Sequence, residues 1–112
     1  MAEAVVFVMD PHDISYSFRF ESPRAAAASV EGYDAHDLEY FGADGTVYRA
    51  TVEGPKWGTV TLHPTPETRL DELLARLGQL AEWQGTALPF DLPRDPEQVW
   101  ARIHARHPPM RP

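Results

Sequence analysis

Two seven-residue segments carry the same pattern of residues that could take part in chemistry. Residues 10–16 and 34–40 both read Asp-x-His-Asp-aliphatic-x-Tyr. Imidazole and carboxylate groups together suit zinc, manganese or iron, so His12 and His36 would contribute to a metal site if the two segments met at one end of a sheet. We favour the alternative that the aspartates cap turns before two strands, because adjacent His and Asp side chains diverge unless the backbone turns sharply.

The other three histidines give weaker indications of chemistry. His104 and His107 lie three residues apart on an expected helix, which places both on one face and allows metal chelation. We favour a solvent-facing helix end, where cationic side chains oppose the helix dipole. His63 precedes Pro64 at the end of an expected strand and is either a general base in a cleft or an ordinary surface residue.

No standard catalytic motif supports these residues. The sequence lacks a Gly-x-Ser-x-Gly segment, a Gly-rich phosphate loop and a His-Glu-x-x-His segment, which mark several common hydrolases and nucleotide-binding proteins. It contains no cysteine, which excludes a thiol nucleophile. No cofactor is predicted.

Aromatic and acidic residues define a candidate protein interface. Trp57 lies in a Gly-Pro-Lys-Trp-Gly turn, and exposed tryptophans are enriched at interface hot spots. The alternative is that its indole covers one end of the core, since an indole can bury a large area. With Trp57 we group Asp34, Asp37, Tyr40 and Tyr48 as candidate interface residues.

The negative charge is concentrated in the first half of the chain. Residues 1–54 contain ten acidic residues and three arginines, whereas residues 55–112 contain seven acidic and seven basic residues. This distribution carries the whole net charge of −7. An acidic surface repels nucleic acid and anionic lipid but attracts a basic protein. The alternative is that the charge only keeps the protein soluble.

Length and composition predict one globular domain over residues 1–112. No run of 18 apolar residues occurs, so we expect no membrane span and a cytoplasmic location. Nine of the ten basic residues are arginine, which together with many alanines and prolines indicates a bacterial genome rich in GC.

Hydrophobic periodicity predicts an order of two strands, a helix, three strands and two helices. The expected strands cover residues 4–9, 14–20, 37–41, 46–53 and 59–63, with a short helix over 23–31. The valine-rich run 4–9 suits a strand buried on both faces, and alternation from Ile14 to Phe20 places the apolar residues on one face. Short connections predict a hairpin between the first two strands and a meander of the last three, with an Asp-Gly turn of positive φ at Gly45. A leucine stripe predicts a long helix over 66–84, and a second helix start predicts one over 96–107. A proline-containing linker over residues 86–94 separates these two helices.

This order, ββαβββαα, predicts an α+β fold with a mainly antiparallel sheet of about five strands. Helices 66–84 and 96–107 should cover one face of the sheet. We expect the other face to be partly open, which would allow exposed aromatic residues to bind a partner or a second copy of the chain.

The preferred functional hypothesis is a small, acidic, non-enzymatic bacterial binding protein. Its sharpest version is an immunity-type or antitoxin-type inhibitor of a basic protein partner, whose association an acidic surface would accelerate. The alternative is a small enzyme or ligand-binding domain that uses His and carboxylate side chains in a cleft between sheet and helix.

Overall fold

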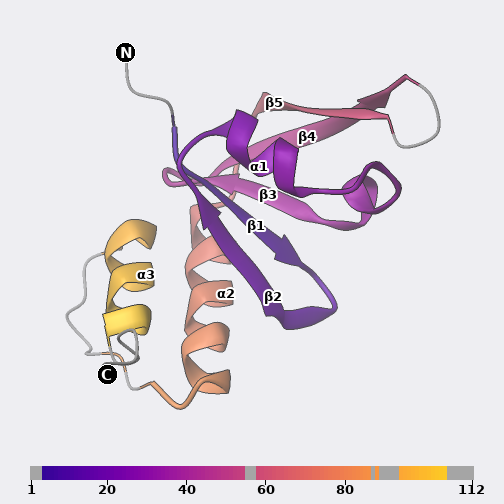
Figure 1. The fold of residues 1–112 in the computed structure, drawn as a ribbon. Helices are drawn as coiled ribbons and strands as arrows, with labels where there is room; N and C mark the ends of the chain where they lie inside the picture. Colours follow the sequence, from indigo (N-terminus) through magenta and orange to yellow (C-terminus); the bar gives the residue numbers. More distant parts are fainter. Residues whose placement is uncertain (1–3, 55–57, 87, 89–93, 106–112) are drawn as a thin grey trace.

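A computed structural model describes residues 4–54, 58–86, 88 and 94–105, and it confirms the predicted α+β class and element order (Figure 1). A short 3-10 helix, η1, adds to the predicted elements. In chain order the elements are β1 (Val6–Asp10), β2 (Asp13–Phe20), α1 (Pro23–Ser29), η1 (Gly32–Asp37), β3 (Glu39–Gly42), β4 (Thr46–Glu53), β5 (Thr59–Thr68), α2 (Leu70–Trp83) and α3 (Pro96–Ala105). No helix in these described ranges is long and apolar enough to cross a membrane.

The five strands form one antiparallel sheet in the order β2-β1-β3-β4-β5. The predicted hairpins β1–β2 and β3–β4 and the meander β3–β4–β5 are all present. The turn between β3 and β4 uses Gly45 at φ 90°, and its N–H donates to the Gly42 carbonyl oxygen over 2.9 Å. Only glycine adopts such a φ readily, so the predicted Asp-Gly turn is confirmed.

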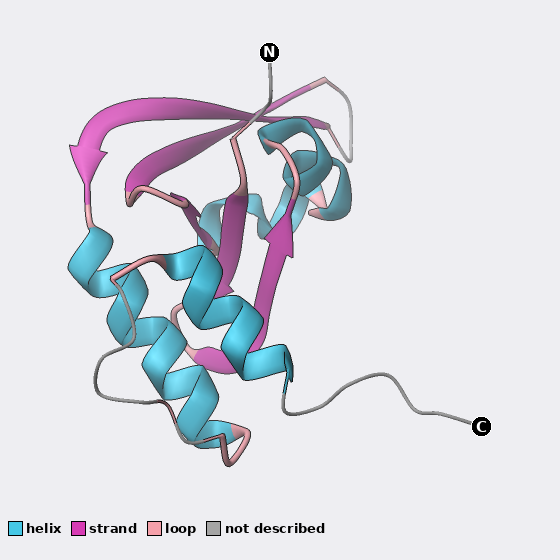
Figure 2. Ribbon diagram, turned by 90° about the vertical axis from the view of Figure 1, so that its left-hand side faces the viewer, coloured by secondary structure: helices cyan, strands magenta, loops and turns pink. Residues whose placement is uncertain are grey.

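Helices cover both faces of the sheet. On one face α2 and α3 lie side by side (Figure 2), and Leu73, Leu77 and Ile103 pack with Phe7 and Phe41 of the strands. On the other face α1 and η1 form a second core with the strands, made of Val6, Val8, Ala26, Val30, Ala35, Tyr40, Ala50 and Leu62. These two short helices cover only part of the face, because Phe18, which lies beside Tyr16 and Phe20, is still 46% exposed and a groove separates α1 from β5. This agrees with the expectation of a partly open second face. Alanine methyl groups let α1 lie close to the sheet, and its Ala26 is fully buried.

A bulge near the start of β2 changes the face on which Ile14 packs. The pairing shifts from Met9–Ser17 to Asp10–Asp13, and the Ser17 hydroxyl donates to the Ile14 carbonyl oxygen over 2.8 Å. Ile14 consequently packs with the α2–α3 core, whereas Tyr16 and Phe20 contact the α1 side. The predicted single alternating face from Ile14 to Phe20 is thus wrong, because an irregularity in the ladder reverses which face a side chain occupies.

Strand β5 continues through two prolines and postpones the start of the long helix. We predicted a helix from residue 66, but β5 extends to Thr68 and α2 begins at Leu70. The Thr65 hydroxyl donates to the Val47 carbonyl oxygen over 2.7 Å, which fastens this segment to β4. Prolines are tolerated here because β5 is an edge strand.

Other boundaries differ by smaller amounts. Residue 37, predicted as the start of a strand, ends η1 instead, and β3 begins at Glu39. The first helix ends at Ser29 rather than at residue 31. The last helix is described as far as Ala105, so its predicted end at residue 107 lies outside the described residues, as does most of the 86–94 linker.

The leucine stripe of α2 generates a stability prediction. Leu73 is fully buried in the α2–α3 core, whereas Gln79 on the same helix is exposed. Leu73→Ala should lower the free energy of unfolding by about 2 to 5 kcal/mol through lost burial and a cavity. Gln79→Ala should change it by less than about 0.5 kcal/mol. Denaturant unfolding of both variants measures the difference, and equal effects would show that the stripe is not core.

Candidate functional site

The first Asp-x-His-Asp segment forms the turn between β1 and β2. The Asp10 carboxylate accepts a hydrogen bond from the His12 backbone N–H over 2.8 Å. The Asp13 carboxylate accepts from the backbone N–H and the hydroxyl of Ser15, over 3.0 and 2.5 Å. These are the local contacts by which aspartate stabilises turns, so the turn-cap interpretation is confirmed for this segment.

The second segment has a different structure. Residues 34–37 lie within η1, and the side chains of Asp34 and Asp37 are exposed. Neither carboxylate makes a hydrogen bond or ion pair with another described residue. The aspartates of this segment are therefore not turn caps of the predicted kind.

Electrostatic contacts at Tyr16 connect the two segments. Tyr16 lies on β2, and its pKa is raised by burial, by Asp34 of the second segment and by Asp10 of the first. The pKa of the exposed Tyr33 is likewise raised by Glu31 and Asp34. The fold thus brings the two segments to one region, which we call the acidic end and define by Asp10, Asp13, Glu31, Asp34 and Asp37.

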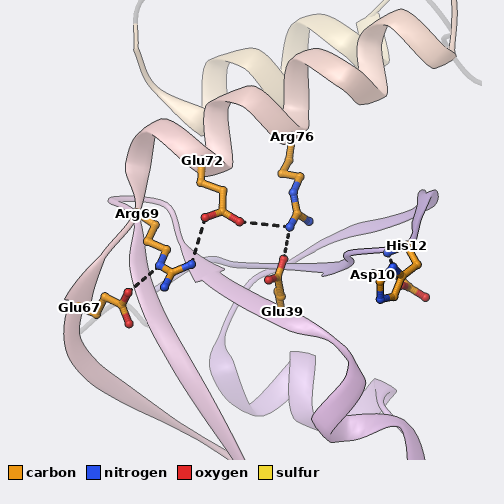
Figure 3. A network of polar contacts seen from close by, with 7 residues as sticks. All are labelled: Asp10, His12, Glu39, Glu67, Arg69, Glu72 and Arg76. Carbon is orange, nitrogen blue, oxygen red and sulfur yellow. Dashed lines mark hydrogen bonds and ion pairs between the residues drawn. The ribbon is translucent and has the colours of Figure 1, made fainter.

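No ion pair compensates the acidic end among the residues that the structure describes. In Figure 3, Asp10 lies apart from a chain of ion pairs on the α2 side of the fold. There Arg76 joins Glu39 of β3 to Glu72 of α2. Charged groups on the α2 side are therefore neutralised locally, whereas the carboxylates of the acidic end leave a negative field at the surface.

A second set of ion pairs holds the helices in place. Arg69 contacts Glu67 over 2.6 Å and Glu72 over 3.2 Å. Arg19 of β2 contacts Glu97 of α3 through two nitrogens, over 2.6 and 3.2 Å. Four arginines thus make all of the ion pairs seen in the described ranges, namely Arg19, Arg69, Arg76 and Arg94.

The predicted interface residues fall into different environments. Tyr40 is only 3% exposed, and its hydroxyl donates to the Ala35 carbonyl oxygen over 2.7 Å. Its ring is therefore unable to contact a partner, and the residue instead fixes η1 against the sheet. Tyr48 is half-buried between two pockets of about 230 and 340 Å³, the larger of which His36 also lines. Trp57 lies outside the described residues.

The histidines do not assemble a metal centre. Among the described residues, no group of three or more His, Asp or Glu side chains is arranged to hold a metal ion. His12 belongs to the β1–β2 turn and His36 to η1, while His104 lies on α3 across the sheet. His107, the proposed partner of His104, lies outside the described residues.

The remaining contacts of the histidines are local. His63 Nε2 lies 2.9 Å from the Thr51 hydroxyl oxygen, and alternation along β5 turns its side chain away from the face that packs on α1. His104 Nδ1 lies 3.0 Å from the Trp100 carbonyl oxygen, and its ring is 4.2 Å from that of Trp100. His36 and Glu67 both line the pocket of about 340 Å³ beside Tyr48, whereas His12, His63 and His104 are not among its lining residues.

The sequence singles out Tyr16 and Tyr33 among the aromatic residues able to define an interface, but it does not place them beside the acidic residues. Tyr33 is 63% exposed and Tyr16 is half-buried. Carboxylates accept hydrogen bonds from guanidinium and ammonium groups, and aromatic faces attract the same cations. A signal for Tyr16 was present in the sequence, because it ends the first of the two repeated segments.

The buried Tyr40 predicts a pH dependence of stability. Burial, with the nearby Tyr16 and Asp34, raises the pKa of Tyr40 from 10.0 to about 12. The unfolded chain therefore loses this proton first, so stability should fall between pH 10 and pH 12, by about 2 to 3 kcal/mol from this group. Tyr40→Phe should cost about 1 to 2 kcal/mol at pH 7 by removing the hydrogen bond to Ala35.

Denaturant unfolding from pH 8 to pH 12 tests both effects. The stability difference between wild type and Tyr40→Phe should shrink as the pH rises through this range. The exposed Tyr33→Phe serves as a control and should change stability little at pH 7. A constant difference at all pH values would show that Tyr40 does not titrate as its burial requires.

The acidic end consists of carboxylates without ion-pair partners beside two tyrosines, and the described part of the chain contains no group of three or more side chains arranged to hold a metal ion. The chain matches no protein-family model, and comparisons with curated proteins and with solved structures find no significant similarity. Any function must therefore be argued from this geometry.

Proposed function

We propose that this chain is a non-enzymatic binding protein that recognises a basic protein through the acidic end. The observation that carries the proposal is the separation of charges described above. Carboxylates near α2 are used in ion pairs, whereas Asp10, Asp34 and Asp37 face solvent or lie at its edge without a cationic partner.

Physical chemistry supports a role in association for such a surface. Uncompensated charges of one sign steer an oppositely charged partner and raise the association rate. Tyr33 and Tyr16 add aromatic surface beside the carboxylates, and tyrosines are enriched among the residues that dominate binding energy. The arrangement fits a partner surface rich in Arg or Lys.

The sharpest form of the proposal is an immunity-type or antitoxin-type inhibitor. A nuclease that binds nucleic acid presents a basic surface, and an acidic protein that covers this surface would block its substrate. The proposal places the protein in the bacterial cytoplasm, where such a nuclease would meet nucleic acid. The arginine-rich composition supports a bacterial source.

Capture of the partner is the first test. The immobilised chain should retain a basic protein from a lysate of its own bacterium at low salt and release it as the ionic strength rises, because salt screens exposed charges. Retention of no basic protein at low salt would contradict the proposal.

The kinetics of the captured pair give the sharper prediction. Asp10→Asn combined with Asp34→Asn should slow association about tenfold at low salt and flatten its salt dependence, with little change in dissociation. Asn at position 10 keeps a side-chain oxygen that can accept the hydrogen bond from the His12 backbone N–H. Surface plasmon resonance measures both rates over a series of salt concentrations.

A matched control removes the same charge elsewhere. Asp71→Asn combined with Glu82→Gln also removes two negative charges, but from exposed positions on α2, one of which pairs with Arg94. This variant should change the association rate much less. If both double variants slow association equally, net charge and not the acidic end steers the partner.

A further inference from the structure

A groove of about 870 Å³ runs between α1 and the outer strand β5. Figure 1 shows α1 beside the β4–β5 part of the sheet. One wall is formed by Arg24, Ala27 and Ala28 of α1, and the other by residues 59–62 of β5. A volume of this size lies within the usual range for ligand sites.

The wall formed by β5 is a free strand edge. Within the described residues β5 pairs only with β4, so one side of its backbone has no neighbouring strand. Natural proteins protect such edges with proline, lysine or a bulge. Residues 59–62 read Thr-Val-Thr-Leu and carry no such protection, whereas prolines follow at 64 and 66. The unprotected half of the strand is the half that lines the groove.

The side chains of the groove suit a peptide backbone. Ala28 is exposed and Ala27 is half-buried, so the helical wall presents only methyl groups at these positions. Val30 and Leu62 are buried and add apolar surface. An edge strand offers backbone donors and acceptors in an extended array, which an extended peptide satisfies by adding a strand.

Opposite charges mark the two ends of the helical wall. Arg24 lies in the first turn of α1 and Glu31 follows its end, and both line the groove. Neither makes an ion pair with a described residue. Arg24 lies within α1, whereas Glu31 follows the extended residue Val30 beyond the helix end, so the two charges lie at opposite ends of this wall.

We infer that this groove binds an extended peptide segment of a partner protein by strand addition to residues 59–62 of β5. The segment carries a carboxylate that meets Arg24 and a cation that meets Glu31. Small or β-branched side chains lie between them, against Ala27 and Ala28. Glu31 belongs both to this groove and to the acidic end, but the inference does not require that Asp10, Asp34 or Asp37 bind a basic protein.

Selection from a display library of random nine-residue peptides tests the inference on the whole chain. Enriched peptides should contain both an acidic residue, for Arg24, and a basic residue, for Glu31. In two-dimensional NMR they should shift the backbone amide signals of residues 59–62 most strongly.

Ala28→Arg should weaken binding at least tenfold, because the longer side chain fills the groove. Ala101→Arg, at an exposed alanine of α3, is the matched control and should bind like wild type. Circular dichroism should give both variants the wild-type melting temperature, since arginine is a good helix former. If Ala28→Arg lowers the melting temperature, the NMR mapping on the wild-type chain shows instead whether the peptides bind at residues 59–62.

Three outcomes would overturn the inference. These are the absence of enriched peptides, peptides that shift amides elsewhere, and a free chain that is a dimer with residues 59–62 covered by the second copy. The Asp10→Asn and Asp34→Asn variant should bind the peptides like wild type, so failure here and failure of the proposed function are distinguishable.

Discussion

The whole fold depends on β1, a strand buried on both faces. Val6, Phe7, Val8 and Met9 are each at most 1% exposed. Because successive side chains of a strand point to opposite faces, Phe7 and Met9 enter the core beneath α2 and α3, while Val6 and Val8 enter the core beneath α1. One four-residue run therefore supports two layers of helix.

This two-sided strand also explains where the acidic end forms. β1 ends at Asp10 and turns into β2, so the first acidic segment must lie at that end of the sheet. β3 pairs with the other side of β1 and carries Tyr40, whose hydroxyl holds Ala35 of η1. The core contact of one tyrosine thus sets the position of Asp34 near Tyr16. The acidic side chains themselves contribute few contacts to the fold.

Local patterns were sufficient to predict elements whose signals lie within a few residues. The valine-rich run indicated a strand buried on both faces, the leucine stripe indicated α2, and Asp-Gly indicated a turn with positive φ, which Gly45 adopts. Asp34 and Asp37 were singled out as candidates from charge alone, and the structure places both side chains at the surface.

The structure differs from the predictions where contacts with residues distant in the sequence determine the local structure. The bulge at Ile14 depends on pairing with β1, and the extension of β5 past Pro66 depends on the Thr65 contact with Val47. The burial of Tyr40 depends on η1 folding over it. None of these partners lies close in sequence to the residue that it contacts. The packing of α1 and η1 on the second face, and the burial that removes Tyr40 from the candidate interface, could therefore be found only from the structure.

We propose that the acidic end serves binding and not folding. The most direct measurement is the free energy of unfolding, at several salt concentrations, of a variant that combines Asp10→Asn, Glu31→Gln, Asp34→Asn and Asp37→Asn. Because these carboxylates repel one another without cationic partners, the variant should be as stable as wild type or up to about 1 kcal/mol more stable at low salt, with a weaker salt dependence. A loss of more than about 1 kcal/mol would contradict the claim, since it would show that these side chains hold the fold together.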